Sequence, residues 1–120
     1  MASDSQIDLL KFQQSSGNVA WLPLVAAAFL RQLPQWRREF DAAVAAHDGT
    51  VQAELLHKIK GACYAVAAYG AAEVLSQAEA LQARNEAQVA SVVLARLALV
   101  ESELQAIIAR ASPAGQTHGL

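Results

Sequence analysis

The 120-residue chain has little cysteine, proline, glycine or charge, and no long apolar run. Its single cysteine, Cys63, excludes an intramolecular disulfide and suits a reducing compartment. The longest apolar run, Trp21 to Leu30, spans about ten residues and includes Pro23, whereas a membrane span needs about 20 residues. The polar N-terminus lacks the pattern of a signal peptide. We therefore expect a cytoplasmic protein that does not insert into a membrane.

Basic residues and metal-ligand clusters are also scarce. Lys and Arg total 9 against 11 Asp and Glu, which gives a formal net charge of -2. Because phosphate contacts need a concentrated basic surface, we expect no nucleic-acid partner. The histidines His47, His57 and His118 have no metal-site spacing with one another or with the carboxylates. We therefore expect no metal site and no cofactor.

Apolar residues make up 54% of the chain, alanine is the commonest residue, and β-branched runs are short, which favours closely packed helices. Apolar positions recur at helical spacings of three and four. They predict helices over about 7–13, from Asn18 or Pro23 to about His47, from Thr50 to Gly70, from Gly70 to a connection at Arg84–Glu86, and over about 87–111. Short connections make neighbouring helices antiparallel. We expect an all-α fold: an antiparallel up-and-down four-helix bundle with a short extra N-terminal helix.

This bundle is expected to form one domain over residues 1–111, followed by a disordered polar tail over 112–120. Pro34 removes a backbone donor and clashes with the preceding turn, so it should kink or split the second helix. Gly49 is expected to end that helix. Gly70 is expected to mark the bend between the third and fourth helices.

The third predicted helix contains the run His57-Lys58-Ile59-Lys60-Gly61. Its apolar stripe consists of Val51, Leu55, Ile59, Ala62, Cys63 and Val66. His57 lies about 200° around the helix from Ile59, so helical geometry predicts an exposed imidazole. An imidazole can act as a nucleophile near neutral pH. Cys63, in contrast, lies on the apolar stripe, where a thiol is usually unreactive.

Six residues share the predicted face of His57, at spacings of three, four and seven: Thr50, Ala53, Glu54, Lys60, Gly61 and Tyr64. Of these, Ala53, Lys60, Gly61 and Tyr64 are expected to belong to the site. Lys60 is one turn away and is expected to reach an anion on the imidazole. A glycine inside a helix costs about 1 kcal/mol relative to alanine, so Gly61 indicates a place where a partner comes close. Lys58 is expected to be an ordinary solvated charge.

The preceding helix is expected to supply one more contact. In an antiparallel hairpin that turns at Asp48–Gly49, Arg38 falls near the level of His57. We expect Arg38 to be a secondary basic contact of the site. Trp36 and Phe40, on the same helix, are expected in the core.

At these residues the chain resembles the histidine-containing phosphotransfer (HPt) domain, which carries a His-x-hydrophobic-Lys-Gly motif on one helix of a four-helix bundle. The resemblance covers roughly residues 7–111 and implies a phosphorelay intermediate without its own kinase. His57 would accept a phosphoryl group from an aspartyl phosphate on one receiver domain and pass it to an aspartate on another. Lys60 would offset the charge on the phosphoryl oxygens. The divalent metal would belong to the receiver domain.

The implied partners are receiver domains of response regulators or of a hybrid histidine kinase, bound by a monomeric chain. One feature departs from the family pattern: the family's second glycine comes sooner after the histidine than Gly70 does. Gly70 is about one helical turn late, which leads us to expect a longer site helix.

Two other functions compete with this interpretation. The chain is alternatively a non-catalytic helical-bundle interaction module in which His57 is an idle surface residue. The dimerisation domain of a histidine autokinase also displays a phosphorylated histidine on a bundle, but it works with an ATP-binding domain. That domain has a glycine-rich lid, and the sequence contains no such segment.

Overall fold

A computed structural model describes residues 7–16, 19–81 and 86–111. Its elements are α1 (Leu9–Ser16), a 3₁₀ turn η2 (Val19–Trp21), α2 (Leu22–Ala45), α3 (Gly49–Ala65), α4 (Tyr69–Leu81) and α5 (Glu86–Ala111). These ranges contain helices and turns but no strand, which confirms the all-α prediction. The expected tail, residues 112–120, and most of the expected connection at 84–86 lie outside the described residues.

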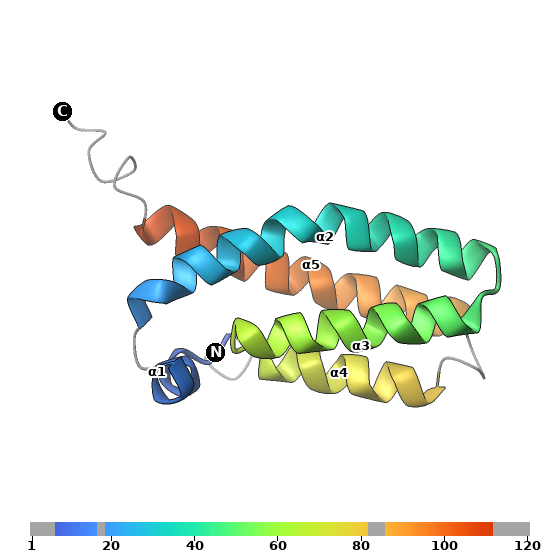
Figure 1. The fold of residues 1–120 in the computed structure, drawn as a ribbon, viewed down its shortest axis with the longest axis horizontal. Coiled ribbons are helices and arrows are strands. Elements are labelled where there is room, and N and C mark those ends of the chain that lie inside the picture. The colour runs from blue at the N-terminus through green and yellow to red at the C-terminus, as the bar shows by residue number, and fades with distance from the viewer. Residues whose placement is uncertain (1–6, 17–18, 82–85, 112–120) are drawn as a thin grey trace.

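The long helices α2 to α5 lie side by side, and each runs opposite to the one before it (Figure 1). α2 packs against both α3 and α5, and α4 also packs against both of them. Each long helix therefore has two long neighbours and an outer face that is free of them. No helix in the described ranges is both long and apolar enough to cross a membrane.

The core lies between these helices and follows the helical spacing of the apolar residues. From α2 it takes Leu22, Ala26, Phe29, Leu33, Trp36, Phe40 and Ala43. From α3 it takes Leu55, Leu56, Ile59 and Cys63. The rings of Phe29 and Trp36 meet edge to face at 5.4 Å, so the expectation that Trp36 belongs to the core is confirmed. Full burial of a Leu, Ile, Val or Phe side chain stabilises the folded state by about 1.5–3 kcal/mol.

Val51 departs from the predicted apolar stripe, because its side chain is exposed. Gln52 is buried in its place, and its Nε2 donates to the carbonyl oxygen of Ala43 on α2 at 3.3 Å. This polar contact joins α3 to α2 close to the turn between them. The first turn of α3 therefore faces the core through an amide that apolar periodicity cannot identify.

The turn between α2 and α3 does not use glycine as expected. His47 adopts the left-handed conformation, with φ 54°. Its N–H donates to the carbonyl of Val44, and that of Asp48 donates to Ala43, the hydrogen-bond pattern of a Schellman motif. The Asp48 side chain accepts from the N–H of Val51 and caps α3. The prediction that Gly49 ends α2 is therefore wrong, because Gly49 is the first residue of α3.

The turn between α3 and α4 has the same construction. Ala67 is left-handed, with φ 60°. Its N–H donates to the carbonyl of Tyr64, while the N–H of Ala68 donates to Cys63. α3 ends at Ala65 and α4 begins at Tyr69, so Gly70 is a helical residue and not a bend. The expectation that the site helix continues to Gly70 is thus wrong.

Pro34 lies inside α2, which continues through it from Leu22 to Ala45. The proline side chain is exposed, whereas Leu33 and Trp36 beside it are buried. A proline in a helix interior costs about 3 kcal/mol. Core packing on both sides of Pro34 offsets that cost, so the helix is not split there.

The short helix α1 lies across one end of the long helices, beside the α3–α4 turn (Figure 1). Ile7 and Phe12 are buried against the core there. The N–H of Asp8 donates to the carbonyl of Ala67 at 2.9 Å, and the N–H of Ile7 donates to Glu103 Oε1 at 3.2 Å. The two residues that lead into α1 therefore join the α3–α4 turn to α5.

Candidate functional site

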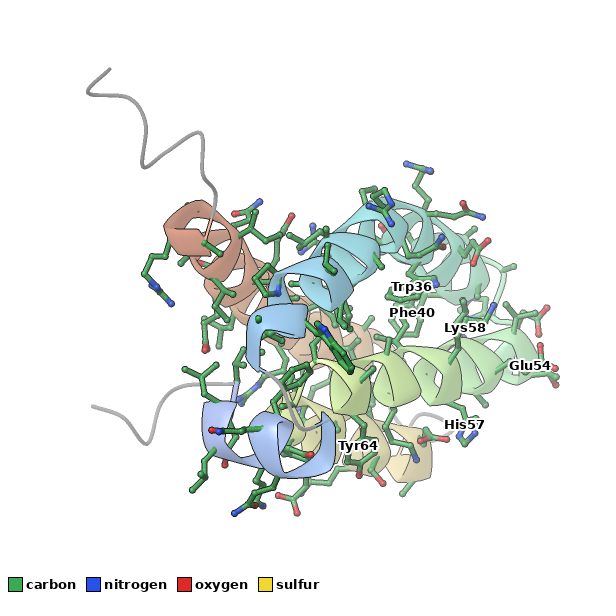
Figure 2. The ribbon with its side chains drawn as sticks, turned by 60° about the vertical axis from the view of Figure 1, so that its left-hand side comes forward. Trp36, Phe40, Glu54, His57, Lys58 and Tyr64 are labelled. Atoms are coloured by element: carbon green, nitrogen blue, oxygen red, sulfur yellow. The ribbon has the colours of Figure 1, made fainter. Side chains whose placement is uncertain are left out.

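His57 is at the centre of α3 and its side chain points away from the core. The helix has 17 residues, and eight of them lie on either side of His57. The imidazole is 77% exposed. Figure 2 shows Trp36 and Phe40 between α2 and α3, while His57 extends from the opposite side of α3. The outer-face placement that helical spacing predicts is what the structure shows.

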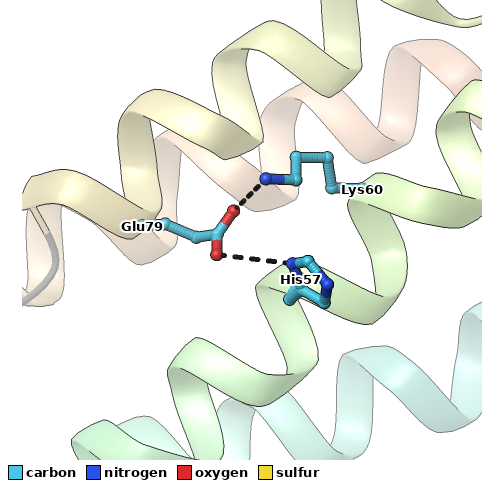
Figure 3. Close-up of polar contacts among 3 residues, drawn as sticks. All are labelled: His57, Lys60 and Glu79. Atoms are coloured by element: carbon cyan, nitrogen blue, oxygen red, sulfur yellow. Dashed lines mark ion pairs between the residues drawn. The ribbon is translucent and has the colours of Figure 1, made fainter.

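A carboxylate from α4 lies beside this imidazole. Glu79 Oε2 is 3.9 Å from His57 Nδ1, and Glu79 Oε1 is 2.7 Å from Lys60 Nζ (Figure 3). The first distance is too long for a hydrogen bond and is an electrostatic contact only. Glu79 thus contacts both the imidazole and the cation one turn along α3.

The Lys60–Glu79 pair is only partly exposed to solvent. The two side chains are 20% and 25% exposed, so water and salt screen their attraction less than at an open surface. Glu79 Oε1 is buried and accepts no well-aligned hydrogen bond, which leaves Lys60 as its close electrostatic partner. Lys60 is therefore held at the site by a charge on a neighbouring helix.

The contact with Glu79 distinguishes the two nitrogens of the imidazole. Nδ1 faces the carboxylate, and Nε2 is on the far side of the ring (Figure 3). A carboxylate beside Nδ1 favours, through its charge, the tautomer with the proton on Nδ1. In that tautomer Nε2, which points away from Glu79, keeps its lone pair (Figure 3).

Gly61 gives the exposed face of α3 a gap. A Cβ built onto this glycine has no heavy atom within 4 Å. Close packing of helices within the protein therefore does not require glycine here. The helix carries a destabilising residue at a position where the fold has room for a side chain.

An apolar groove lies between α2 and α3, and the residue after Gly61 is one of those that line it. Its volume is about 210 Å³, and Ala62 and Ala65 line it on α3. Val25 and Ala28 line it on α2. The side chains next to Gly61 on this side of α3 are therefore small and apolar.

The other expected site residues lie farther from the Glu79 contact. Ala53 is half-buried on α3, one turn before His57. Tyr64 is 49% exposed and packs against the ring of Tyr69, with ring centroids 5.7 Å apart. Arg38 is exposed on α2, and Lys58 is exposed on α3. The contacts of His57 and Lys60 come from α4, so a role for Arg38 stays a prediction.

Glu79 is the site residue that sequence reasoning missed. In antiparallel helices, residues equally far from the turn lie at the same level. His57 is ten residues before Ala67 and Glu79 is twelve after it, so the true turn brings them together. A turn placed at Gly70 pairs His57 with position 83 instead. The misplaced turn hid the contact.

Cys63 takes no part in this site. It is a buried free cysteine on the core side of α3. Burial raises the pKa of its thiol from 9.0 to about 12, so the thiol stays protonated at neutral pH. Among the described residues, no three or more His, Cys, Asp or Glu side chains gather as a metal site.

Comparisons with known proteins add no relative to this description. No protein-family model, no curated protein and no solved structure matches the chain.

Proposed function

We propose that the chain is a phosphorelay intermediate of the histidine-containing phosphotransfer kind. His57 accepts a phosphoryl group from the aspartate of one receiver domain and passes it to the aspartate of another. We also propose that its fold is the antiparallel four-helix bundle with a short extra N-terminal helix that this function uses. The packing of α2 to α5 and the end position of α1 support that description.

The observation that carries the proposal is the combination on the outer face of α3. An imidazole that is 77% exposed stands at the middle of the helix, with a cation one turn away. Gly61 lies on the same face, and a Cβ built there has no heavy atom within 4 Å. An idle surface histidine accounts for the exposure of His57, but it accounts for neither Gly61 nor the position of Lys60.

The chemistry needs little from this chain beyond a positioned nucleophile. The Nε2 lone pair of neutral His57 attacks phosphorus, and the bond between phosphorus and the receiver's aspartyl oxygen breaks. The electron pair of that bond leaves with the aspartate, and the Nδ1 proton stays on the ring beside Glu79. Such transfers depend chiefly on in-line positioning and on charge stabilisation. The protruding imidazole gives the in-line approach, and Lys60 gives the charge.

The proposed partners are the receiver domains of response regulators or of a hybrid histidine kinase. Gly61 is one helical turn from His57 on the exposed face of α3, where a receiver must come within bonding distance of Nε2. Small side chains at this surface let the two backbones approach closely. The chain itself acts as a monomeric carrier, and the phosphoryl group enters and leaves through partners.

The test is phosphoryl acceptance from phosphorylated receiver domains of the same genome. His57→Gln is expected to abolish acceptance and to leave helicity unchanged, because the side chain is exposed and makes no core contact. His47→Gln is the matched control, since it removes another exposed imidazole outside the site. Label on the His57→Gln variant, or loss of acceptance by the His47→Gln variant alone, contradicts the proposal.

A further inference from the structure

Glu79 occupies a position that the transfer chemistry leaves unexplained. Its carboxylate is 2.7 Å from the cation that is to stabilise the phosphoryl group, and 3.9 Å from the imidazole that is to carry it. An ordinary surface ion pair is exposed and weak. This one is three-quarters or more buried on both sides and spans two helices.

The pair places two anions in competition for one cation. Before transfer, Lys60 is neutralised by Glu79. After transfer, His57 carries phosphoryl oxygens that attract the same ammonium group. Lys60 gains this contact only by weakening the one with Glu79. The negative charge of Glu79 also repels the phosphoryl group, because both lie beside the same ring.

We propose, on the basis of the proposed function, that Glu79 sets the equilibrium of phosphoryl transfer between His57 and a receiver's aspartate. It holds Lys60 in the unphosphorylated protein and gives Lys60 up when His57 is phosphorylated. Formation of phosphohistidine therefore weakens the attraction between Lys60 and Glu79, and this loss makes phosphohistidine less stable. A carrier built in this way retains the phosphoryl group less strongly, and so passes it on more readily.

Other charges near His57 do not have this arrangement. Glu54 and Lys58 are exposed on α3, and Figure 2 shows Glu54 pointing outward from the helices. Glu79 alone contacts both His57 and Lys60 among the ion pairs of residues 7–16, 19–81 and 86–111. Glu54 is therefore the matched control: it is also a carboxylate near His57, but it has no contact with Lys60.

The experiment measures the equilibrium between phosphohistidine and a receiver's aspartyl phosphate. Glu79→Gln is expected to shift it about fivefold toward phosphohistidine, and Lys60→Gln about fivefold away from it. In the Lys60→Gln background, Glu79→Gln is expected to have less than about half of its effect, because the two residues act as a pair. Glu54→Gln is expected to leave the equilibrium unchanged. An equal shift from Glu54→Gln, or none from Glu79→Gln, overturns the proposal.

A second measurement does not depend on any receiver. Phosphoramidate phosphorylates accessible imidazoles directly, so it loads a chain in which His47→Gln and His118→Gln leave His57 as the only histidine. The ¹⁵N NMR signal of Lys60 Nζ is expected to move on loading in the wild type. It is expected to differ between the wild type and Glu79→Gln before loading and to differ less after loading, because the loaded protein has given up the Lys60–Glu79 contact. An unmoved signal overturns the role of Glu79. If the signal moves while no receiver delivers a phosphoryl group, the proposed function fails and the contact exchange stands.

Discussion

Gly61 is the single residue whose chemistry is best explained by a partner. It is exposed, and a side chain there meets no atom within 4 Å. The isolated protein therefore gains nothing from glycine at this position and loses helix stability by having it. A residue that costs stability without an internal reason is typical of a functional surface.

Two substitutions separate the effect of Gly61 on stability from its effect on receiver docking. Gly61→Ala is expected to raise the free energy of unfolding by about 1 kcal/mol, because alanine is the better helix former. Gly61→Glu also keeps the fold but is expected to slow transfer from a receiver by about tenfold or more, since a bulky charge blocks close approach. Urea denaturation and transfer rates measure the two effects. A destabilising Gly61→Ala, or wild-type transfer by Gly61→Glu, contradicts the docking role.

Cys63 shows the opposite case, a residue whose chemistry the fold suppresses. Its thiol has a raised pKa of about 12 in the folded protein, because burial disfavours the thiolate, against 9.0 for an exposed thiol. The folded state thus holds this proton more tightly than the unfolded state does. The stability that follows is fully present below pH 9 and is lost as the pH rises from 9 toward 12.

The expected result is a pH-dependent difference between the wild type and Cys63→Ala. Above pH 9 the unfolding midpoint of the wild type should fall relative to that of Cys63→Ala, which lacks the titrating group. Below pH 9 the difference between the two should stay constant. Urea melts at several pH values measure it. Parallel pH profiles up to pH 12 would show that the buried thiol does not titrate as described.

At the scale of elements, the two turns that flank α3 define the site. Each is a Schellman turn with a left-handed residue other than glycine, His47 at one end and Ala67 at the other. These turns fix the length of α3, and with it the level of His57 against α4. An error of three residues in the second turn removes Glu79 from the predicted site.

His47 therefore gives a test of the turn itself. His47→Gly is expected to raise the free energy of unfolding by about 1 kcal/mol, because glycine adopts a positive φ without the steric cost of a side chain. Ala46→Gly, one residue earlier and right-handed with φ -87°, is expected to lower it. Thermal or urea unfolding measures both. Equal effects of the two glycines would mean that the left-handed turn does not form.

Much of this arrangement follows from sequence pattern, and the exceptions have identifiable causes. The spacing of apolar residues predicts the long helices, the core positions of Trp36 and Phe40, and the exposed face of His57. The positions of the glycines gave wrong predictions of the two turns. Gly49 and Gly70 are in helices, while His47 and Ala67 are the left-handed turn residues. Backbone hydrogen bonds hold both turns, and at Ala67 a further one comes from Asp8, far away in the sequence, which local propensity does not encode.

At the scale of the whole molecule, α1 closes one end of the helices and leaves the sides open. Phe12 of α1 and the preceding Ile7 are buried there, and the N–H of Asp8 donates to the carbonyl of Ala67, ten residues after His57. No other element of residues 7–16, 19–81 and 86–111 packs on the outer face of α3 between α2 and α4. Rigid neighbours on both sides hold that face in place, as a surface that presents one imidazole to partners requires.

The central claim is that His57 carries a phosphoryl group from one receiver domain to another. The most direct measurement loads the chain from a phosphorylated receiver, isolates it, and mixes it with a second, unphosphorylated receiver from the same genome. The account predicts label on His57 Nε2 alone, and its rapid appearance on the second receiver's aspartate. Label on another residue, or labelled chain that loses its phosphoryl group equally fast with and without every receiver tested, would contradict the account.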